Sequence, residues 1–419
     1  MQIRQIRPLR ALLMLAAGCV LGFALLTAAF LLPTGPMRDH LWESLWTFKQ
    51  EGDYPIANRH YAGSTWDNFT DSLLLQEAIF YDASKSPLEK AVYIYRDDCG
   101  SVGMLNLAAQ LEGQTEKGEP ISYARYWHGA LVWLRPLLLL LNYEDIRTLI
   151  CMTQVLLFAA VALLMVSRGQ RSLVLPYAAM ILTLAPTGTM LSIQYFSLYA
   201  IMTLGMAFVL LKGEWLRQGA RSFYFFLLLG MLTSYFDLLT YPIVTLGMPL
   251  ALMLCVNRRE AGLPFAVAAC ASWAVGYLGL WALKWVVGSL LVGENLLSGA
   301  LEVVAFHTVI GEESRPVTRW QAIAQNVGVV CQPAYALLYG GCLAACALRL
   351  RRCRAGIRAL AGQSRLLLLL ALLPFAWWFV TFHHVSAHNW YTYRALAVTV
   401  FAVLAWLSPP CTAAHPQEA

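Results

Sequence analysis

Long apolar stretches recur along almost the whole of this sequence, and they limit the folds that it can adopt. The first runs from Ala11 to Leu32 without a charged residue, and comparable stretches return as far as Leu407. A helix of about 20 apolar residues crosses the hydrocarbon core of a bilayer. Hydrophobic residues make up 59% of the chain and charged residues only 13%, whereas a soluble domain carries roughly 25% charged residues. The sequence therefore predicts an all-α polytopic membrane protein.

We predict about ten transmembrane helices, with both ends of the chain on the same side of the membrane. The first stretch is longer than the roughly 7–15 apolar residues of a signal peptide, so we interpret it as an uncleaved first span. The predicted spans cover residues 11–32, 146–166, 173–184, 195–211, 223–235, 243–256, 263–291, 327–348, 366–381 and 395–407.

Basic residues gather in alternate connections between these spans. By the positive-inside rule such connections lie in the cytoplasm, which places both termini inside and residues 33–128 outside. We therefore predict a multi-pass membrane protein with cytoplasmic N- and C-termini. It belongs in the plasma membrane if the protein is bacterial and in the endoplasmic reticulum if it is eukaryotic, and the short loops and compact tails favour the plasma membrane. No block of basic residues indicates nucleic-acid binding, and no paired cysteine spacing indicates a metal site. The basic residues of the cytoplasmic set are Arg4, Arg7, Arg10, Arg168, Arg171, Lys212, Arg217, Arg221, Arg258, Arg259, Arg349, Arg351, Arg352, Arg354, Arg358 and Arg365.

We interpret residues 1–419 as a single membrane domain in which one long polar segment interrupts the apolar pattern. This segment, residues 33–128, holds most of the acidic residues and is predicted to form a large, mostly helical first extracytoplasmic loop with a loop-rich tip at residues 100–118. Residues 129–141 are apolar but too short to span a bilayer, and Arg135-Pro136 interrupts them. They are therefore predicted to form a re-entrant or interfacial helix before the second span.

Two aspartates in the polar segment are the candidate catalytic residues. Ser64 or Thr65 is expected to cap a helix, and Asp67 and Asp71 follow in its first turns, where the helix dipole favours negative charge. Because the two aspartates are four residues apart, a helix places both carboxylates on one face. The alternative interpretation is two ordinary acids at a helix start.

Other charged residues are weaker candidates. Asp39 and Glu43 have the same spacing and are the alternative acid pair, but a solvated amphipathic helix explains them equally well. Asp237 lies beside a predicted helix break, where it either caps the turn or takes part in function. Lys284 lies in an apolar span, where it either extends to the interface or binds a phosphate.

Two clusters of cationic and aromatic residues on the outer side are candidate substrate-binding sites. Arg125 and His128 precede the short apolar segment, and His388 and Arg394 lie in a polar hinge between the last two predicted spans. Arginine supplies several donors and stays charged, so these residues suit a lipid phosphate; an interfacial aromatic belt would have the same composition. His384 and His388 have a helical metal-ligand spacing, but no acid completes a site. No metal ligand is assigned, and the use of a divalent cation stays open.

The order of a large outer loop, a short apolar segment and a second span resembles the GT-C superfamily of polytopic glycosyltransferases. Residues 123–137 and residues 142–150, which lead into the second span, carry the resemblance. Members transfer a sugar from a polyprenyl phosphate at the outer face, and their first outer loop carries the catalytic acid. The resemblance implies a polyprenyl-phosphate-linked sugar donor, a lipid or glycan acceptor, proton removal by one carboxylate, and inversion at the sugar carbon.

Three other functions compete with this one. A membrane transporter or a flippase for lipid-linked saccharides is expected to show an inverted repeat and more intramembrane charge. An O-antigen-type polymerase or ligase resembles this chain in its number of spans, but its large outer loop lies nearer the C-terminal half. A non-catalytic scaffold with an outer interaction domain would not depend on Asp67 and Asp71.

Overall fold

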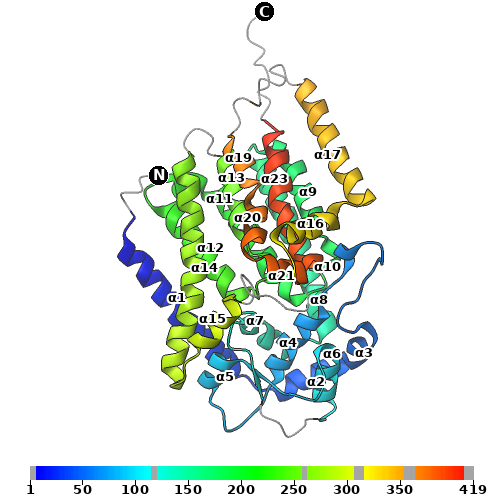
Figure 1. Ribbon diagram of the computed structural model, residues 1–419, viewed down its shortest axis with the longest axis vertical. Helices are drawn as coiled ribbons and strands as arrows, with labels where there is room; N and C mark the ends of the chain where they lie inside the picture. The colour runs from blue at the N-terminus through cyan, green and yellow to red at the C-terminus, as the bar shows by residue number, and fades with distance from the viewer. Residues whose placement is uncertain are drawn as a thin grey trace, which may run out of the picture.

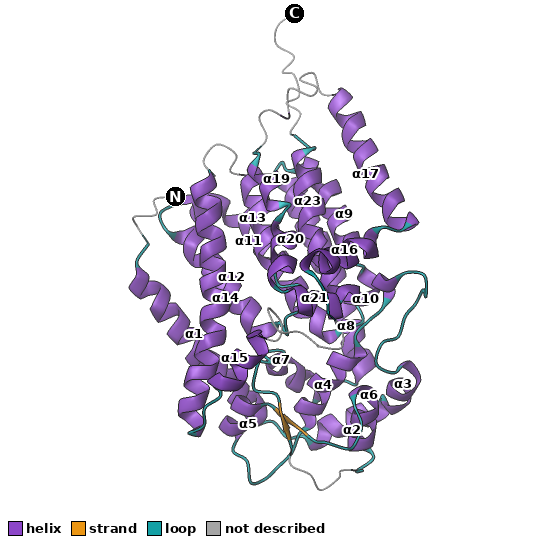
Figure 2. Ribbon diagram, in the orientation of Figure 1, coloured by secondary structure: helices purple, strands orange, loops and turns teal. Residues whose placement is uncertain are grey.

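Most of the described residues lie in helices. The computed structural model describes residues 6–114, 120–256, 262–305, 316–352, 360 and 364–409. Within these residues the only strands are β1 (Tyr95–Arg96) and β2 (Ile121–Ser122), an antiparallel pair in which Tyr95 lies opposite Ser122 (Figure 2). The described chain is thus all-α, as the apolar pattern predicts.

The helices fall into two groups, which we call the N-terminal layer and the bundle. The layer comprises α2 (Gly35–Glu43), α3 (Leu45–Glu51), the 3₁₀ turn η2 (Ala62–Ser64), α4 (Asn68–Ile79), α5 (Pro87–Tyr93) and α6 (Gly103–Leu111), and α7 (Leu131–Leu138) follows it. The bundle comprises α1 (Pro8–Phe30), α8 (Tyr143–Ser167), η3 (Arg171–Leu173), α9 (Val174–Thr183), α10 (Pro186–Thr189), α11 (Ile193–Arg217), α12 (Arg221–Phe236), α13 (Val244–Val256), α14 (Leu263–Val292), α15 (Leu297–Ala305), α16 (Arg319–Val330), α17 (Pro333–Arg352), α19 (Leu366–Leu370), α20 (Leu373–Val380), α21 (Phe382–Ala387), α22 (Asn389–Thr392), η5 (Tyr393–Ala395) and α23 (Leu396–Trp406).

Several bundle helices have the length and composition of membrane spans. Among the described residues, five helices are long and apolar enough to cross a bilayer: α1, α8, α11, α14 and α17. Shorter apolar helical stretches cover Arg171–Thr183, Val244–Val256 and Leu366–Val380. The chain is therefore an all-α membrane protein. Several residues of the predicted cytoplasmic connections lie outside the described residues: Arg4, Arg258, Arg259, residues 353–359 and 361–363, and the C-terminus after residue 409.

The structure corrects three predicted boundaries. The span predicted at 327–348 is broken, because α16 ends at Val330 and α17 begins at Pro333; proline has no N–H to continue a helix and disfavours helical backbone in the residue before it. The span predicted at 366–381 is divided between α19 and α20. The predicted loop at 100–118 contains helix α6. Met104, Leu107 and Leu111 form the buried face of α6, a spacing that fits an amphipathic helix.

The N-terminal layer covers one end of the bundle. Figure 1 shows α2 to α6 in the lower part of the molecule, which the ends of α1 and α14 also reach, and α9, α13, α19 and α23 in the upper part. One large apolar cluster fills the bundle, and a second joins α1 to the layer and α7.

Within the bundle α12 and α14 approach closely at Gly230 and Gly276, where an added Cβ would lie 2.1 Å from a backbone oxygen of the other helix. Small residues at such crossings let membrane helices pack backbone to backbone.

Arg135 connects α7 to the end of the first span. Its guanidinium is buried and donates to the carbonyl oxygens of Ala29 at 2.8 Å and Leu32 at 2.9 Å, and also to that of Ala78. The last carbonyl groups of a helix have no partner within that helix, so Arg135 satisfies such groups at the ends of both α1 and α4. This contact fixes α4, which carries the candidate acids, against the bundle. α7 itself has only eight residues.

Candidate functional site

A cavity of about 190 Å³ lies where the N-terminal layer meets the bundle. Its walls come from segments that are far apart in the sequence: the start of α4, the residues before α7, the start of α11, and the region of α21 and α22. Among its described lining residues, Asp67 is the one acid and Arg125 the one permanently charged base. The lining residues are Tyr54, Asp67, Phe69, Thr70, Leu73, Tyr123, Arg125, Tyr126, Gln194, Leu238, His384, His388, Trp390 and Tyr391.

Asp67 reaches the cavity because it is the N-cap residue of α4. Helix α4 begins at Asn68, and the backbone of Asp67 is non-helical, with φ −107° and ψ 75°. The expected cap at Ser64 or Thr65 is therefore wrong. The N-cap position suits aspartate, because its side chain can accept a hydrogen bond from one of the first free N–H groups of the helix.

The Asp67 carboxylate is buried but retains room for one more hydrogen bond. One oxygen accepts the backbone N–H of Thr70 at 3.0 Å, and the other accepts the Thr70 hydroxyl at 2.8 Å and the side-chain N–H of Gln194. A carboxylate offers about four acceptor positions, so three donors leave roughly one for a ligand. Burial raises the pKa of Asp67 to about 6, although the bonds from Thr70 and Gln194 and the charge of Arg394 act in the opposite direction.

Asp71 does not line the cavity. Its carboxylate accepts the backbone N–H groups of Ile193 at 2.9 Å and Gln194 at 3.2 Å, together with the hydroxyl of Tyr143 at 3.0 Å. These N–H groups are the first of α11, so Asp71 caps that helix from outside and places negative charge at its positive end. Burial raises the pKa of Asp71 to about 7, against the effect of the Ile193 N–H. The two aspartates therefore have different environments, and only Asp67 faces open space.

Arg125 and His388 line the same cavity as Asp67, from two different walls. Arg125 is exposed, and its guanidinium carbon lies 4.8 Å from the ring centre of Tyr123. His388 stacks on Tyr391 with ring centres 5.2 Å apart. Burial lowers the pKa of His388 to about 4, so at pH 7 its imidazole is neutral and can donate a hydrogen bond without supplying charge.

His128 is buried beside an acid from α4 and is not a lining residue. Its Nδ1 lies 2.8 Å from a carboxylate oxygen of Glu77, and both side chains have no exposed surface. Burial lowers the pKa of His128, an effect that the neighbouring Glu77 opposes. This pair joins α4 to the segment before α7, so His128 contributes to the wall behind Tyr123, whose ring centre lies 4.8 Å from that of His128.

Arg394 also lies behind the cavity wall. It is fully buried and donates to the carbonyl oxygens of Leu184, Trp390 and Gly63 at 2.8, 3.3 and 3.3 Å. Because these carbonyl oxygens occupy its donors, the structure gives Arg394 a bracing position. Its positive charge nevertheless acts on Asp67 and lowers the pKa of that carboxyl.

The other sequence candidates have local roles or exposed positions. Asp39 and Glu43 are exposed on α2. Asp237 caps a turn, accepting the N–H of Thr240 at 3.0 Å and its hydroxyl at 2.6 Å. His384 and His388 have ring centres 4.8 Å apart, but within the described ranges no group of three or more His, Cys, Asp or Glu side chains is arranged to hold a metal ion.

Several polar and aromatic residues of the cavity, among them Gln194, Tyr54 and Trp390, are not candidates from the sequence. Gln194 bonds Asp67 through its side chain and Asp71 through its backbone. Tyr54 and Trp390 meet edge to face, with ring centres 5.4 Å apart. A polar residue in the first turn of an apolar span, as at Gln194, was the one available signal. The approach of Tyr54 to Trp390 has no sequence signature, because these residues lie on different parts of the fold.

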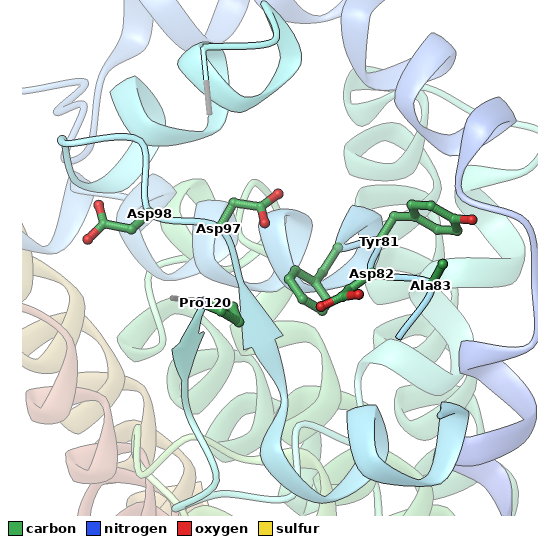
Figure 3. A pocket seen from close by; sticks show the side chains of 7 residues that line it. Tyr81, Asp82, Ala83, Asp97, Asp98 and Pro120 are labelled. Atoms are coloured by element: carbon green, nitrogen blue, oxygen red, sulfur yellow. The ribbon is translucent and has the colours of Figure 1, made fainter. Parts of the chain in front are cut away.

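A second cavity, of about 280 Å³, lies within the N-terminal layer and is lined by Phe80, Tyr81, Asp82, Ala83, Asp97, Asp98 and Pro120. Figure 3 shows the carboxylates of Asp97 and Asp98 turned in different directions. Asp97 accepts a hydrogen bond from Gln110 at 2.6 Å, and Asp82 accepts one from the Ser84 hydroxyl at 2.7 Å. None of the candidate residues from the sequence lines this cavity.

The fold thus defines the class of the molecule as an all-α membrane protein with a polar cavity at one end of its bundle. No protein-family model matches the chain, and neither a curated protein nor a solved structure is similar to it.

Proposed function

We propose that the chain is a membrane glycosyltransferase, similar to the GT-C superfamily, that moves a sugar from a polyprenyl-phosphate donor to an acceptor hydroxyl of a lipid or glycan. One observation carries the proposal: Asp67, Arg125 and His388, which come from three distant segments, line a single cavity. A base, a cation and a neutral donor around one cavity are the groups that a sugar transfer from a phosphate leaving group requires.

The roles follow from the position and charge of each side chain. The acceptor oxygen attacks the anomeric carbon of the sugar while the bond from that carbon to the phosphate oxygen breaks. The acceptor proton passes to the unused acceptor position of Asp67, whose pKa of about 6 leaves it ionised at neutral pH and still basic. Arg125 stabilises the charge on the departing lipid phosphate, and His388 donates a hydrogen bond. A single displacement of this kind inverts the anomeric carbon.

The aromatic residues of the cavity fit a sugar substrate. Tyr54, Trp390 and Tyr391 line it beside Asp67, and aromatic rings offer flat apolar faces next to polar edges. A pyranose or furanose ring likewise has apolar C–H faces and polar hydroxyl edges. A cavity with one carboxylate, one guanidinium and several rings therefore suits a sugar phosphate better than an ion or a purely apolar lipid.

The proposal includes a membrane topology. The chain crosses the plasma membrane about ten times, with both termini in the cytoplasm and residues 33–128 outside, because the basic connections obey the positive-inside rule. In this arrangement the N-terminal layer lies at the extracytoplasmic surface, and residues 129–141 form a re-entrant or interfacial helix. The cavity then opens where a lipid phosphate headgroup would be.

Replacement of Asp67 by asparagine tests the function directly. Asparagine is about as good an N-cap as aspartate, so Asp67→Asn should keep α4 and remove only the proton acceptor. We expect sugar transfer to fall by roughly 10²- to 10⁴-fold, while binding of a labelled donor is kept. The assay uses purified protein and a panel of synthetic polyprenyl-phosphate pentoses and hexoses.

The matched control is Asp39→Asn, which changes an exposed acid of α2 and should leave transfer unchanged. Near-full activity of Asp67→Asn would exclude Asp67 as the base. Absence of transfer by the unaltered protein from every donor of the panel, with glycan and lipid acceptors present, would contradict the glycosyltransferase proposal.

A further inference from the structure

One face of α14 holds the backbone at Arg125. Trp281, Lys284 and Trp285 are three and four residues apart, so the helix presents them on one face. The indole N–H groups of Trp281 and Trp285 donate to the carbonyl oxygen of Arg125, at 2.6 and 3.2 Å. The amine of Lys284 donates to the carbonyl oxygen of Tyr126. We call these three side chains of α14 the α14 clamp.

Two further contacts join the same segment to α14. The ring of Tyr126 stacks on that of Trp281, with centres 5.6 Å apart and planes inclined by 14°. The indole N–H of Trp127 donates to the carbonyl oxygen of Leu280 at 3.0 Å. Residues 125–127 are thus fixed to α14 at each position, in the wall of the cavity that holds Asp67.

Lys284 occupies a position where an amine needs partners, and its nitrogen lies 5.9 Å from the ring centre of Trp127. Its side chain is only 1% exposed and lies in a helix that is apolar enough to cross a membrane. An amine at such a depth is costly unless it is hydrogen-bonded, and methionine would fill a similar space without that cost. The amine of Lys284 donates to the carbonyl oxygen of Tyr126, one peptide beyond the carbonyl group that Trp281 and Trp285 hold. The charge of Glu77 also acts on this amine.

We propose that the α14 clamp is a set of positioning residues, which fix the backbone carbonyl groups of Arg125 and Tyr126 so that the Arg125 guanidinium stands at the cavity where the donor phosphate binds. The inference rests on the proposed function and adds Trp281, Lys284 and Trp285 to it. Arg125 is exposed and its long side chain has many rotamers. A fixed backbone limits where this side chain can reach, and small displacements of a binding group reduce rates strongly.

A double-mutant cycle between Lys284 and Arg125 tests the clamp. The probe is the polyprenyl-phosphate sugar of the panel that the unaltered protein uses fastest. We expect Lys284→Met to raise the KM for this donor by roughly 10-fold or more with a smaller change in kcat. In the Arg125→Ala background the same substitution should add about 2-fold or less, because the group that the clamp positions has already gone.

Trp281→Phe provides a second variant that keeps the ring stack and removes one N–H donor. It should change the donor KM in the same direction as Lys284→Met, and this variant decides the question if Lys284→Met does not fold. The control is Val286→Ala, at a half-exposed position of the same helix, which should leave KM unchanged.

The outcomes separate the two proposals. Equal increases in KM with and without Arg125, or an unchanged KM in both folded clamp variants, overturn the clamp while the transferase function stands. An unaltered protein that transfers no sugar overturns both.

Discussion

Gln194 offers the sharpest test of the proposed base, because it touches Asp67 without being part of the reaction. Its side-chain N–H donates to the Asp67 carboxylate, and its backbone N–H separately donates to the Asp71 carboxylate. Gln194→Leu therefore removes one donor from Asp67 and keeps the backbone contact that stabilises the start of α11. The remaining donor to Asp67 in this variant is Thr70, through its N–H and its hydroxyl.

The size of the effect follows from the hydrogen bond that is lost. A hydrogen bond to a charged group stabilises it by roughly 1.5–3 kcal/mol, and 1.36 kcal/mol corresponds to about one pKa unit. Burial raises the pKa of Asp67 to about 6 while Gln194 lowers it, so the variant should have a pKa of roughly 7–8. At pH 7 the ionised fraction then falls from roughly 90% to between roughly 10% and 50%.

The assay is the pH dependence of kcat/KM for transfer from the lipid-linked donor. A base must be ionised, so kcat/KM should rise as pH increases through the pKa of Asp67. The midpoint of this rising limb of the pH profile should move from about pH 6 in the unaltered protein to roughly pH 7–8 in Gln194→Leu. At pH 9 the variant should regain most of its activity. Gln170→Leu, at a half-buried glutamine before α9, serves as the control. A limb that stays near pH 6 in Gln194→Leu would refute the assignment of the base.

Two further experiments test the remaining assignments. Asp71→Asn should lower the free energy of unfolding in detergent by roughly 1–3 kcal/mol, because the amide must turn its NH₂ group toward one of three donors. Sugar transfer per folded molecule should change little. A fully stable but inactive variant would give Asp71 the catalytic role instead. In a cysteine-free background, Ser101→Cys should react with an impermeant thiol reagent in intact cells and Ser167→Cys should not, since they lie in predicted outer and inner connections. The reverse labelling would invert the topology.

Sequence patterns were most informative where a single element decides the outcome. Helix α1 (Pro8–Phe30) and α14 (Leu263–Val292) lie within a few residues of the predicted spans, because an apolar run of such length has one stable conformation in a bilayer. The patterns were least informative at helix ends. A run of apolar residues does not show that Pro333 starts a new helix, since proline is also accepted in the first turn of a continuing chain.

At the candidate site, too, the sequence identified some of the residues and the structure decided their roles. The sequence supplied Asp67, Arg125 and His388 as candidates from their chemistry and their place in polar segments, and the structure puts all three around one cavity. It also supplied Asp71, His128 and Arg394, whose polar atoms are used by other parts of the protein. Residue type alone does not separate the two sets. An aspartate that faces a cavity and an aspartate that caps a helix are the same residue type, and both occur near the start of a helix.

By itself, the sequence determined that the chain is an all-α membrane protein with one long polar segment, because hydropathy acts on each stretch independently of its neighbours. Tertiary structure alone decided which aspartate faces the cavity. A helical periodicity treats Asp67 as a residue of α4, but as the N-cap residue it has non-helical backbone angles, and its side chain points elsewhere than the periodicity predicts. The partner that occupies Asp71, the start of α11, lies more than a hundred residues away in the sequence. Only the packing of α4 against α11 brings those N–H groups to one acid and leaves the other open.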